Sequence, residues 1–136
     1  MKIHEKLPSR LELILSFVNK LLEKLKPLLL EKDVFNIKLS LEEALVNAVK
    51  HGNKLRADLF VEVIAEAEDG VLRIKVKDQG EGFDFNNLPN PTQNDNLQKT
   101  SGRGIFLIRN LMDKVEFFDC GKGVEMIKFL RRGGKA

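Results

Sequence analysis

The chain has 136 residues, close to the most common size of one domain, and 43% of them are hydrophobic, so a core can form without a metal or disulfide. A net charge of +3 and the absence of Trp and Tyr argue against a nucleic-acid surface. The single cysteine, Cys120, excludes an internal disulfide and a cysteine-based zinc cluster. With no signal-like start and no apolar run of membrane length, we predict one cytoplasmic domain over residues 1–136, away from membranes.

The amino-terminal part of the chain predicts a strand and then a helix. Residues 2–7 alternate polar and apolar side chains, as half-buried strands do. Ser9 followed by Glu12 has the spacing of a capping box, in which the serine hydroxyl caps the helix that follows it. The helix is expected to reach about Lys26, where Pro27 ends or kinks it.

A second helix carries an unusual polar stripe beside its apolar one. Its apolar residues recur at steps of three and four and comprise Ile37, Leu41, Ala44, Leu45, Ala48 and Val49. Glu43, Asn47 and His51 are four apart, so they are expected to line up on one side of the helix. Gly52-Asn53 tolerates the left-handed conformation and is expected to stop the helix. The stripe is either a site or a solvated edge.

Two strands follow, joined by the hairpin turn Asp69-Gly70. Alternation predicts one buried face and one face on which glutamates oppose lysines and arginines across the strands. The same alternation places Asp78 on the buried face, where a carboxylate is costly unless it accepts hydrogen bonds. Gly80 and Gly82 follow it and allow a backbone or a ligand to approach closely. An Asp opening a glycine turn is the ordinary alternative interpretation.

A polar segment without periodicity then leads to a third helix. An irregular connection of this length is usually functional or disordered, and a lid over about residues 84–103 is the functional form we predict. Gly102 and Gly104 open the next helix, where free backbone N–H groups and the positive end of the helix dipole form a ready site for phosphate.

The chain closes with a predicted hairpin over residues 115–130. Cys120 lies in its turn with no base or metal ligand nearby in sequence, so we expect a structural role for it. Much of the basic excess falls at this end of the chain, and we expect it to be a solvated terminus. These basic residues are Lys128, Arg131, Arg132 and Lys135.

The helix stripe and the two glycine motifs occur in the order of a known pattern. Taken together, they resemble the N box and the two glycine boxes of the Bergerat (GHKL) ATPases, the histidine kinase-like ATPase superfamily. The stretches Glu43–Gly52 and Gly104–Asp113 are most similar to those of the stand-alone anti-sigma factor serine/threonine protein kinases of bacteria. The resemblance covers almost the whole chain.

The resemblance implies a role for each motif residue. Asn47 would bind Mg²⁺, a cation that prefers oxygen ligands and takes few from protein. Glu43 would orient or deprotonate the nucleophile that attacks the γ-phosphate. Asp78 would accept a hydrogen bond from the adenine amino group, with Gly80 and Gly82 admitting the base. The last two motif glycines, which would hold phosphate under the lid, are Gly102 and Gly104. His51, Lys99 and Arg103 stay unassigned.

The fold and function that follow are expectations of the same resemblance. The fold is a two-layer α/β (α+β) sandwich of the Bergerat type, a mixed, mostly antiparallel sheet with helices on one face. The activity is that of an ATP- and Mg²⁺-dependent serine/threonine protein kinase. Its partners would be an anti-sigma factor antagonist protein, which it phosphorylates, and a sigma factor, which it regulates by partner switching. Relatives commonly form homodimers, which no feature of this sequence decides.

Three alternatives stay open. The chain could be a regulatory binding module that uses ATP only to set its partner affinity, although such a module has no need of Glu43. It could be a detached histidine kinase ATPase domain, although no helical hairpin with a phosphoacceptor histidine is predicted. It could also be a relic of the fold that binds no nucleotide.

Overall fold

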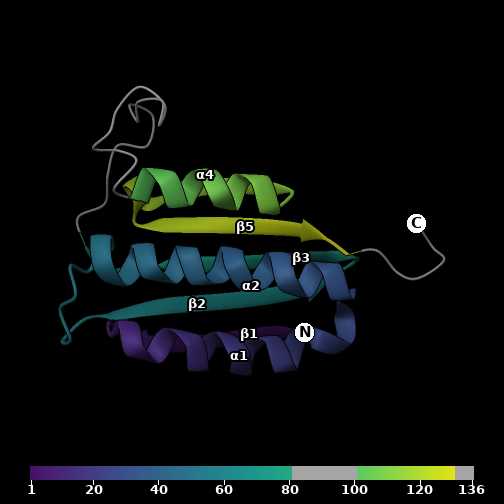
Figure 1. The fold of residues 1–136 in the computed structure, drawn as a ribbon, viewed down its shortest axis with the longest axis horizontal. Coiled ribbons are helices and arrows are strands. Elements are labelled where there is room, and N and C mark those ends of the chain that lie inside the picture. Colours follow the sequence, from purple (N-terminus) through teal and green to yellow (C-terminus); the bar gives the residue numbers. More distant parts are fainter. Residues whose placement is uncertain (81–100, 131–136) are drawn as a thin grey trace.

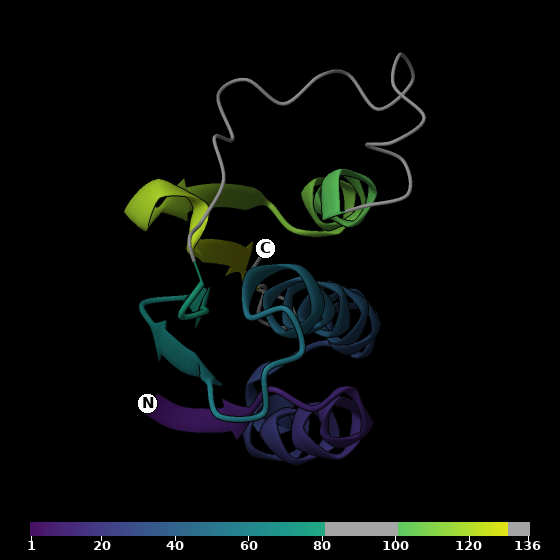
Figure 2. The ribbon, with the colours of Figure 1, turned by 90° about the vertical axis from the view of Figure 1, so that its left-hand side faces the viewer.

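The chain folds into two layers, with helices on one face of a single sheet (Figures 1 and 2). The structure is a computed structural model that describes residues 1–80 and 101–130, with the backbone alone at 101–105. No helix in these ranges is long and apolar enough to cross a membrane. The predicted fold class, an α/β sandwich with helices on one face, is confirmed.

The elements follow one another much as the alternation and periodicity predict. The strands are β1 (Lys2–Pro8), β2 (Phe60–Glu68), β3 (Val71–Lys77), β4 (Lys114–Phe118) and β5 (Gly123–Phe129). The α-helices are α1 (Ile14–Leu25), α2 (Glu31–Val46) and α4 (Ser101–Leu111). Short 3₁₀ or π-helical pieces are η1 (Leu11–Leu13), η2 (Lys26–Leu28), η3 (Asn47–Gly52) and η5 (Asp119–Gly121).

The five strands are ordered β1-β2-β3-β5-β4. We expected a mixed, mostly antiparallel sheet, and all four pairings within the described ranges are antiparallel. The connection from β3 to β4 contains α4, and β5 then returns to pair with β3. The end of β3 therefore lies in the interior of the sheet, and Asp78 follows directly after it.

The face of the sheet away from the helices carries charges in complementary rows. Glu62 lies opposite Lys77 in the register of β2 and β3, and Glu66 lies opposite Arg73. This confirms the predicted cross-strand pairing on a solvated face. The hairpin turn is confirmed as well, because Asp69 and Gly70 adopt φ of 53° and 78°, the left-handed values that such a tight turn requires.

The hydrophobic core fills the space between the helices and the inner face of the sheet. Apolar residues that recur at helical spacing on α1 and α2 meet the alternate inward residues of β2, β3 and β5. The largest fully buried side chains include Leu25, Ile37, Leu41, Leu45, Leu72, Ile74 and Met126. The packing of the helices on the sheet holds the carboxyl-terminal end of α2 near the carboxyl-terminal end of β3, where the candidate site lies.

The predicted capping box at Ser9 is wrong. The α-helix begins only at Ile14 after a 3₁₀ turn, and no side chain caps either element. Ser9 is instead buried, and its hydroxyl accepts a hydrogen bond from the Asn53 side chain at 2.6 Å. A hydroxyl committed to a distant amide cannot satisfy the free N–H groups of its own helix.

Lys128 is also not part of a solvated terminus, as we had expected. Its side chain lies on the inner face of β5, and its ammonium lies 4.0 Å from the carboxylate of Asp33 in the first turn of α2. The same ammonium donates to the backbone oxygen of Leu111, the last residue of α4. One partly buried cation therefore connects α2, α4 and the sheet. The other basic residues of the tail lie outside the described residues.

Candidate functional site

The helix with the polar stripe changes its winding at the stripe. α2 ends at Val46, and the chain continues as a π-helix from Asn47 to Gly52. Such π-helical turns are rare and frequently lie at functional sites. Glu43 and Asn47 are both half-buried, and neither side chain has a hydrogen-bond or ion-pair partner among the described residues. Within residues 1–80 and 101–130, two polar groups at the helix end therefore remain unpaired.

His51 does not continue the stripe inward. Its side chain is exposed, since the wider π turn changes the direction of residues that follow Asn47. Partial burial, together with the charge of Lys50, lowers the pKa of His51, so its imidazole is neutral at physiological pH. The histidine contributes no fixed charge to the site.

Asp78 lies on the inner face directly after β3, as the alternation predicts, and its residue exposure is 7%. Its Oδ1 accepts a hydrogen bond from the backbone N–H of Gly80 at 2.8 Å. Its own N–H donates to the backbone oxygen of Lys122, which holds the residue against the start of β5. Within the described residues, no donor bonds Oδ2. Oδ2 is the carboxylate oxygen that lies against Gly52.

The electrostatic environment of Asp78 disfavours its charge. Burial raises the pKa of this carboxyl, and the Gly80 N–H group and the charge of Lys122 offset that rise only in part. A carboxyl with a raised pKa in an enclosed position is a recurrent property of functional sites. Such an acid is stabilised when a ligand donates a hydrogen bond to it.

Two glycines allow the helix end and the strand end to meet. A methyl group added at Gly52 would overlap the Asp78 carboxylate, and one added at Gly80 would overlap the backbone carbonyl of Gly52. The predicted close approach at Gly80 is therefore present, although the partner within the described residues is the π-helix end. The π-helix Asn47–Gly52 therefore contacts Asp78 through its last residue, Gly52.

Sequence reasoning missed a residue at this junction. Asn53, expected only to stop the helix, is buried and bonds side chains or backbone of three other segments. Its φ is −86°, and the left-handed residues are Lys54 and Leu55 instead. An Asn after a Gly has no periodic signal that would distinguish a helix stop from a buried hydrogen-bonding residue.

The remaining predicted site residues are described only in part. Gly102 and Gly104 lie in the first turn of α4, where the free N–H groups of a helix are found. α4 also contacts both α2 and the π-helical segment that continues it. Gly82, Lys99 and the expected lid up to residue 100 lie outside the described residues, as does the Arg103 side chain.

The sequence of this chain matches the model of an ATPase domain family. Residues 5–128 match the histidine kinase-like ATPase domain. Because that match spans most of the chain, the chain belongs to this family, and the predicted superfamily resemblance is confirmed.

Within the family, the chain is similar to bacterial protein kinases. Serine-protein kinase RsbW of Staphylococcus epidermidis is 32% identical over 108 residues, which cover 74% of this chain and 68% of the relative. The proteins of the same name in Staphylococcus aureus strains bovine RF122 and MSSA476 are 27% and 28% identical over the same length. The similarity therefore favours a kinase-type member of the family.

Proposed function

We propose that this protein is an Mg-ATP-dependent serine/threonine protein kinase of the anti-sigma type, which phosphorylates a Ser or Thr of a small antagonist protein and regulates a sigma factor. The observation that carries the proposal is the pair Glu43 and Asn47, half-buried at the start of a π turn with no partner among the described residues. A structural helix end would leave such groups to solvent or pair them.

The residues present fit the nucleotide and its metal. Asp78 offers Oδ2 to a donor such as the adenine amino group. Gly52 and Gly80 allow the backbone to approach the Asp78 carboxylate closely, because neither has a side chain. Asn47 offers an amide oxygen, a ligand that suits Mg²⁺ when phosphates and water complete the shell. The first turn of α4, with Gly102 and Gly104, offers backbone N–H groups to the phosphates. The only acids among the proposed site residues are Asp78, which would face the adenine base, and Glu43, which would face the attacking hydroxyl.

Bound Mg-ATP would supply the γ-phosphoryl group and a metal that offsets phosphate charge. The attacking oxygen would be the hydroxyl of the partner's Ser or Thr, and it would form the new P–O bond as the bond to the β-phosphate oxygen breaks and ADP leaves. Glu43 would orient that hydroxyl and accept its proton. Asn47 and the α4 N–H groups would keep the phosphates in position, since phosphoryl transfer depends mainly on positioning and charge stabilisation.

Phosphate transfer is the first experiment. The purified chain is incubated with radiolabelled ATP and the candidate antagonist protein, and label on the antagonist is measured. Glu43→Gln is expected to reduce transfer by about a hundredfold or more, while ATP affinity stays within about twofold, because general-base catalysis contributes at this scale. Glu42→Gln is the matched control, since neighbouring helix residues point about 100° apart.

The outcomes separate the alternatives. Intact ATP binding with no transfer would overturn the kinase proposal and favour a regulatory ATP-binding module. Equal transfer by the wild type and Glu43→Gln would remove Glu43 from the role of base. Calorimetric titration of ATP, with Asp78→Asn as the variant that removes the acid, decides whether the chain binds nucleotide at all.

A further inference from the structure

The side chain of Asn53 makes three hydrogen bonds inside the protein, using both of its N–H donors. Its exposure is 1%, and its Nδ2 donates to the Ser9 hydroxyl at 2.6 Å and to the Phe60 backbone oxygen at 3.0 Å. Its Oδ1 accepts the backbone N–H of Gln79 at 2.7 Å. One amide therefore bonds the segment after β1, the first residue of β2 and the residue after Asp78.

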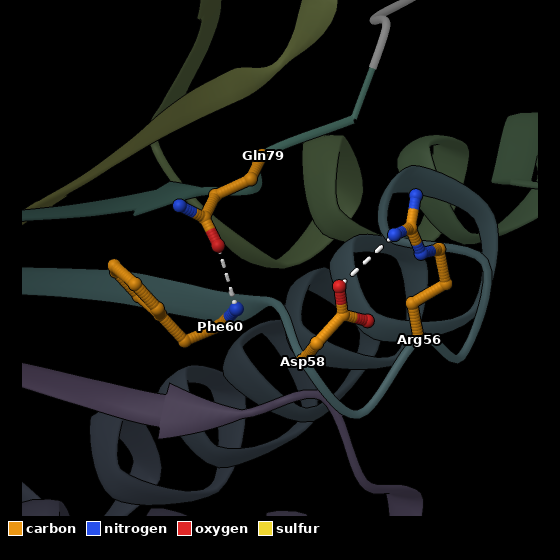
Figure 3. Close-up of polar contacts among 4 residues, drawn as sticks. All are labelled: Arg56, Asp58, Phe60 and Gln79. Carbon is orange, nitrogen blue, oxygen red and sulfur yellow. Dashed lines mark hydrogen bonds and ion pairs between the residues drawn. The ribbon is translucent and has the colours of Figure 1, made fainter.

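Gln79 is held from two directions. Its main-chain N–H donates to Asn53, and its side-chain Oε1 accepts the backbone N–H of Phe60 at 2.8 Å (Figure 3). Asp78 immediately precedes it, and Gly80 immediately follows and donates to the Asp78 carboxylate. The two hydrogen bonds at Gln79 therefore restrain the turn Asp78–Gly80, which carries the acid.

Gly52, the last residue of the π-helix, and Asn53, which follows it, both contact the turn that carries Asp78. Gly52 lies against the Asp78 carboxylate, and the next residue, Asn53, holds the peptide that follows Asp78. The backbone of Asn53 is fixed in turn, since its N–H donates to Ala48 inside the π segment at 2.7 Å. The acid and the segment that begins with Asn47 therefore share one rigid connection.

We propose that Asn53 is a positioning residue of the nucleotide site, which holds the turn after Asp78 so that the Asp78 carboxylate selects adenine. The proposal rests on the proposed function, because it takes Asp78 as the group that binds the base. It assigns no contact with the nucleotide to Asn53 itself. Loss of the amide would let the turn move and would weaken recognition of the base while leaving recognition of the phosphates unchanged.

Asn53→Asp is the variant that tests this assignment. It keeps the shape of the side chain but removes both donors, so Ser9 and Phe60 no longer anchor the oxygen that accepts from Gln79. It also places a negative charge beside the Phe60 carbonyl. We expect the dissociation constant for Mg-ATP to rise about tenfold or more and the preference for ATP over GTP to fall. The reason is that a displaced Asp78 carboxylate would lose its hydrogen bond from the adenine amino group, and hydrogen bonds to a charged group are among the stronger ones. The affinity for Mg-tripolyphosphate, which has no base, should stay within about twofold.

A purely structural role predicts a different set of results. It would lower the melting temperature and leave the ATP-to-GTP ratio unchanged in the folded protein. Leu25→Ala is the matched control: it removes a buried core side chain at the last residue of α1, which has no part in the hydrogen bonds of Asn53, and should lower stability without changing the ratio. Binding is measured by calorimetry on the full chain, at a temperature where circular dichroism shows each variant folded.

Ser9→Ala provides a second test if Asn53→Asp does not fold. It removes one of the two acceptors of Nδ2, so the same loss of base preference is expected at about two- to fivefold. An unchanged ATP-to-GTP ratio in every variant that folds, including Ser9→Ala alone, would overturn the assignment of Asn53. If the wild type itself binds no ATP, the proposed function fails instead, and the two failures are thereby distinguished.

Discussion

The carboxylate of Asp78 lies directly against the Cα of Gly52, where the end of β3 meets the end of the π-helix. A contact this close requires that residue 52 have no side chain, because protein interiors are packed too tightly to absorb a methyl group there. The backbone of one element therefore forms the wall beside the acid on the other. This arrangement makes glycine at position 52 a requirement of the site.

Gly52→Ala is accordingly expected to displace the Asp78 carboxylate and to weaken Mg-ATP binding by about tenfold or more in calorimetric titration. Gly70→Ala is the matched control in the β2–β3 turn, where φ is +78° and the added methyl group would have only ordinary contacts. The control should lose about 1 kcal/mol of stability from backbone strain and keep its ATP affinity. Wild-type affinity in Gly52→Ala would contradict the placement of the acid.

The raised pKa of Asp78 makes stability depend on pH. Because the folded pKa lies above the ordinary value of 3.8, the folded state holds more protons than the unfolded state between these two values. The free energy of unfolding therefore falls as the pH rises through that interval. Above that interval the charged acid costs stability, so Asp78→Asn is expected to stabilise the protein in the absence of nucleotide and to weaken ATP binding.

Urea denaturation at a series of pH values measures this effect. The stability gained by Asp78→Asn should disappear as the pH falls below 3.8, where Asp78 is protonated in both states. Asp58→Asn is the exposed control (Figure 3), paired with Arg56 at 2.9 Å, and should change stability by no more than about 1 kcal/mol. A loss of stability at neutral pH in Asp78→Asn would contradict the burial argument.

The sequence predicts well those structural features that depend only on residues close together in the chain. The two-residue alternation of β3 places Asp78 on the inner face, and the structure confirms this because each step along a strand reverses the side chain. The hairpin at Asp69-Gly70 is confirmed for a similar reason, since the left-handed turn depends on adjacent residues only. Local geometry is sufficient for both.

Partners that are distant in sequence explain the errors. Ser9 has the local pattern of a helix cap, but its hydroxyl bonds Asn53, which is 44 residues away. Nothing near Ser9 indicates whether a buried amide will compete with the helix end for that hydroxyl. The roles of both residues depend on how β1, β2 and the π-helix assemble, which periodicity does not determine.

The expectation that Lys128 is solvated was wrong, and the alternation of β5 predicts its true position. Val124 and Met126 point to the core, so the residue two steps further on the same strand points there too. Its partner, Asp33, still could not be named, because their contact requires α2 to be placed against the sheet. Charge composition alone suggested solvent for a residue that lies inside.

The ion pair of Lys128 with the buried Asp33 makes a prediction about stability. Lys128→Met is expected to lower the free energy of unfolding by about 3 kcal/mol, since it leaves the carboxylate of Asp33 buried without its cation and removes the donor to Leu111. Adding Asp33→Asn should restore much of that loss. Lys114→Met, on the exposed side of β4, is the control and should have little effect. Additive losses in the double variant would contradict the pairing.

The final prediction concerns Cys120, whose structural role was expected from sequence. Its φ of 55° and ψ of 38° are left-handed, a conformation that costs a non-glycine residue about 1 kcal/mol or more, and the side chain is exposed. Cys120→Gly should therefore raise the free energy of unfolding by about 0.5–1 kcal/mol, after the greater freedom of glycine in the unfolded chain is subtracted. Cys120→Ala, which keeps the strain, should leave stability nearly unchanged in the same urea titration. Phosphate transfer should be equal in the wild type and both variants, because the thiol takes no part in it; a loss of transfer in both would show that the sulfur itself is needed.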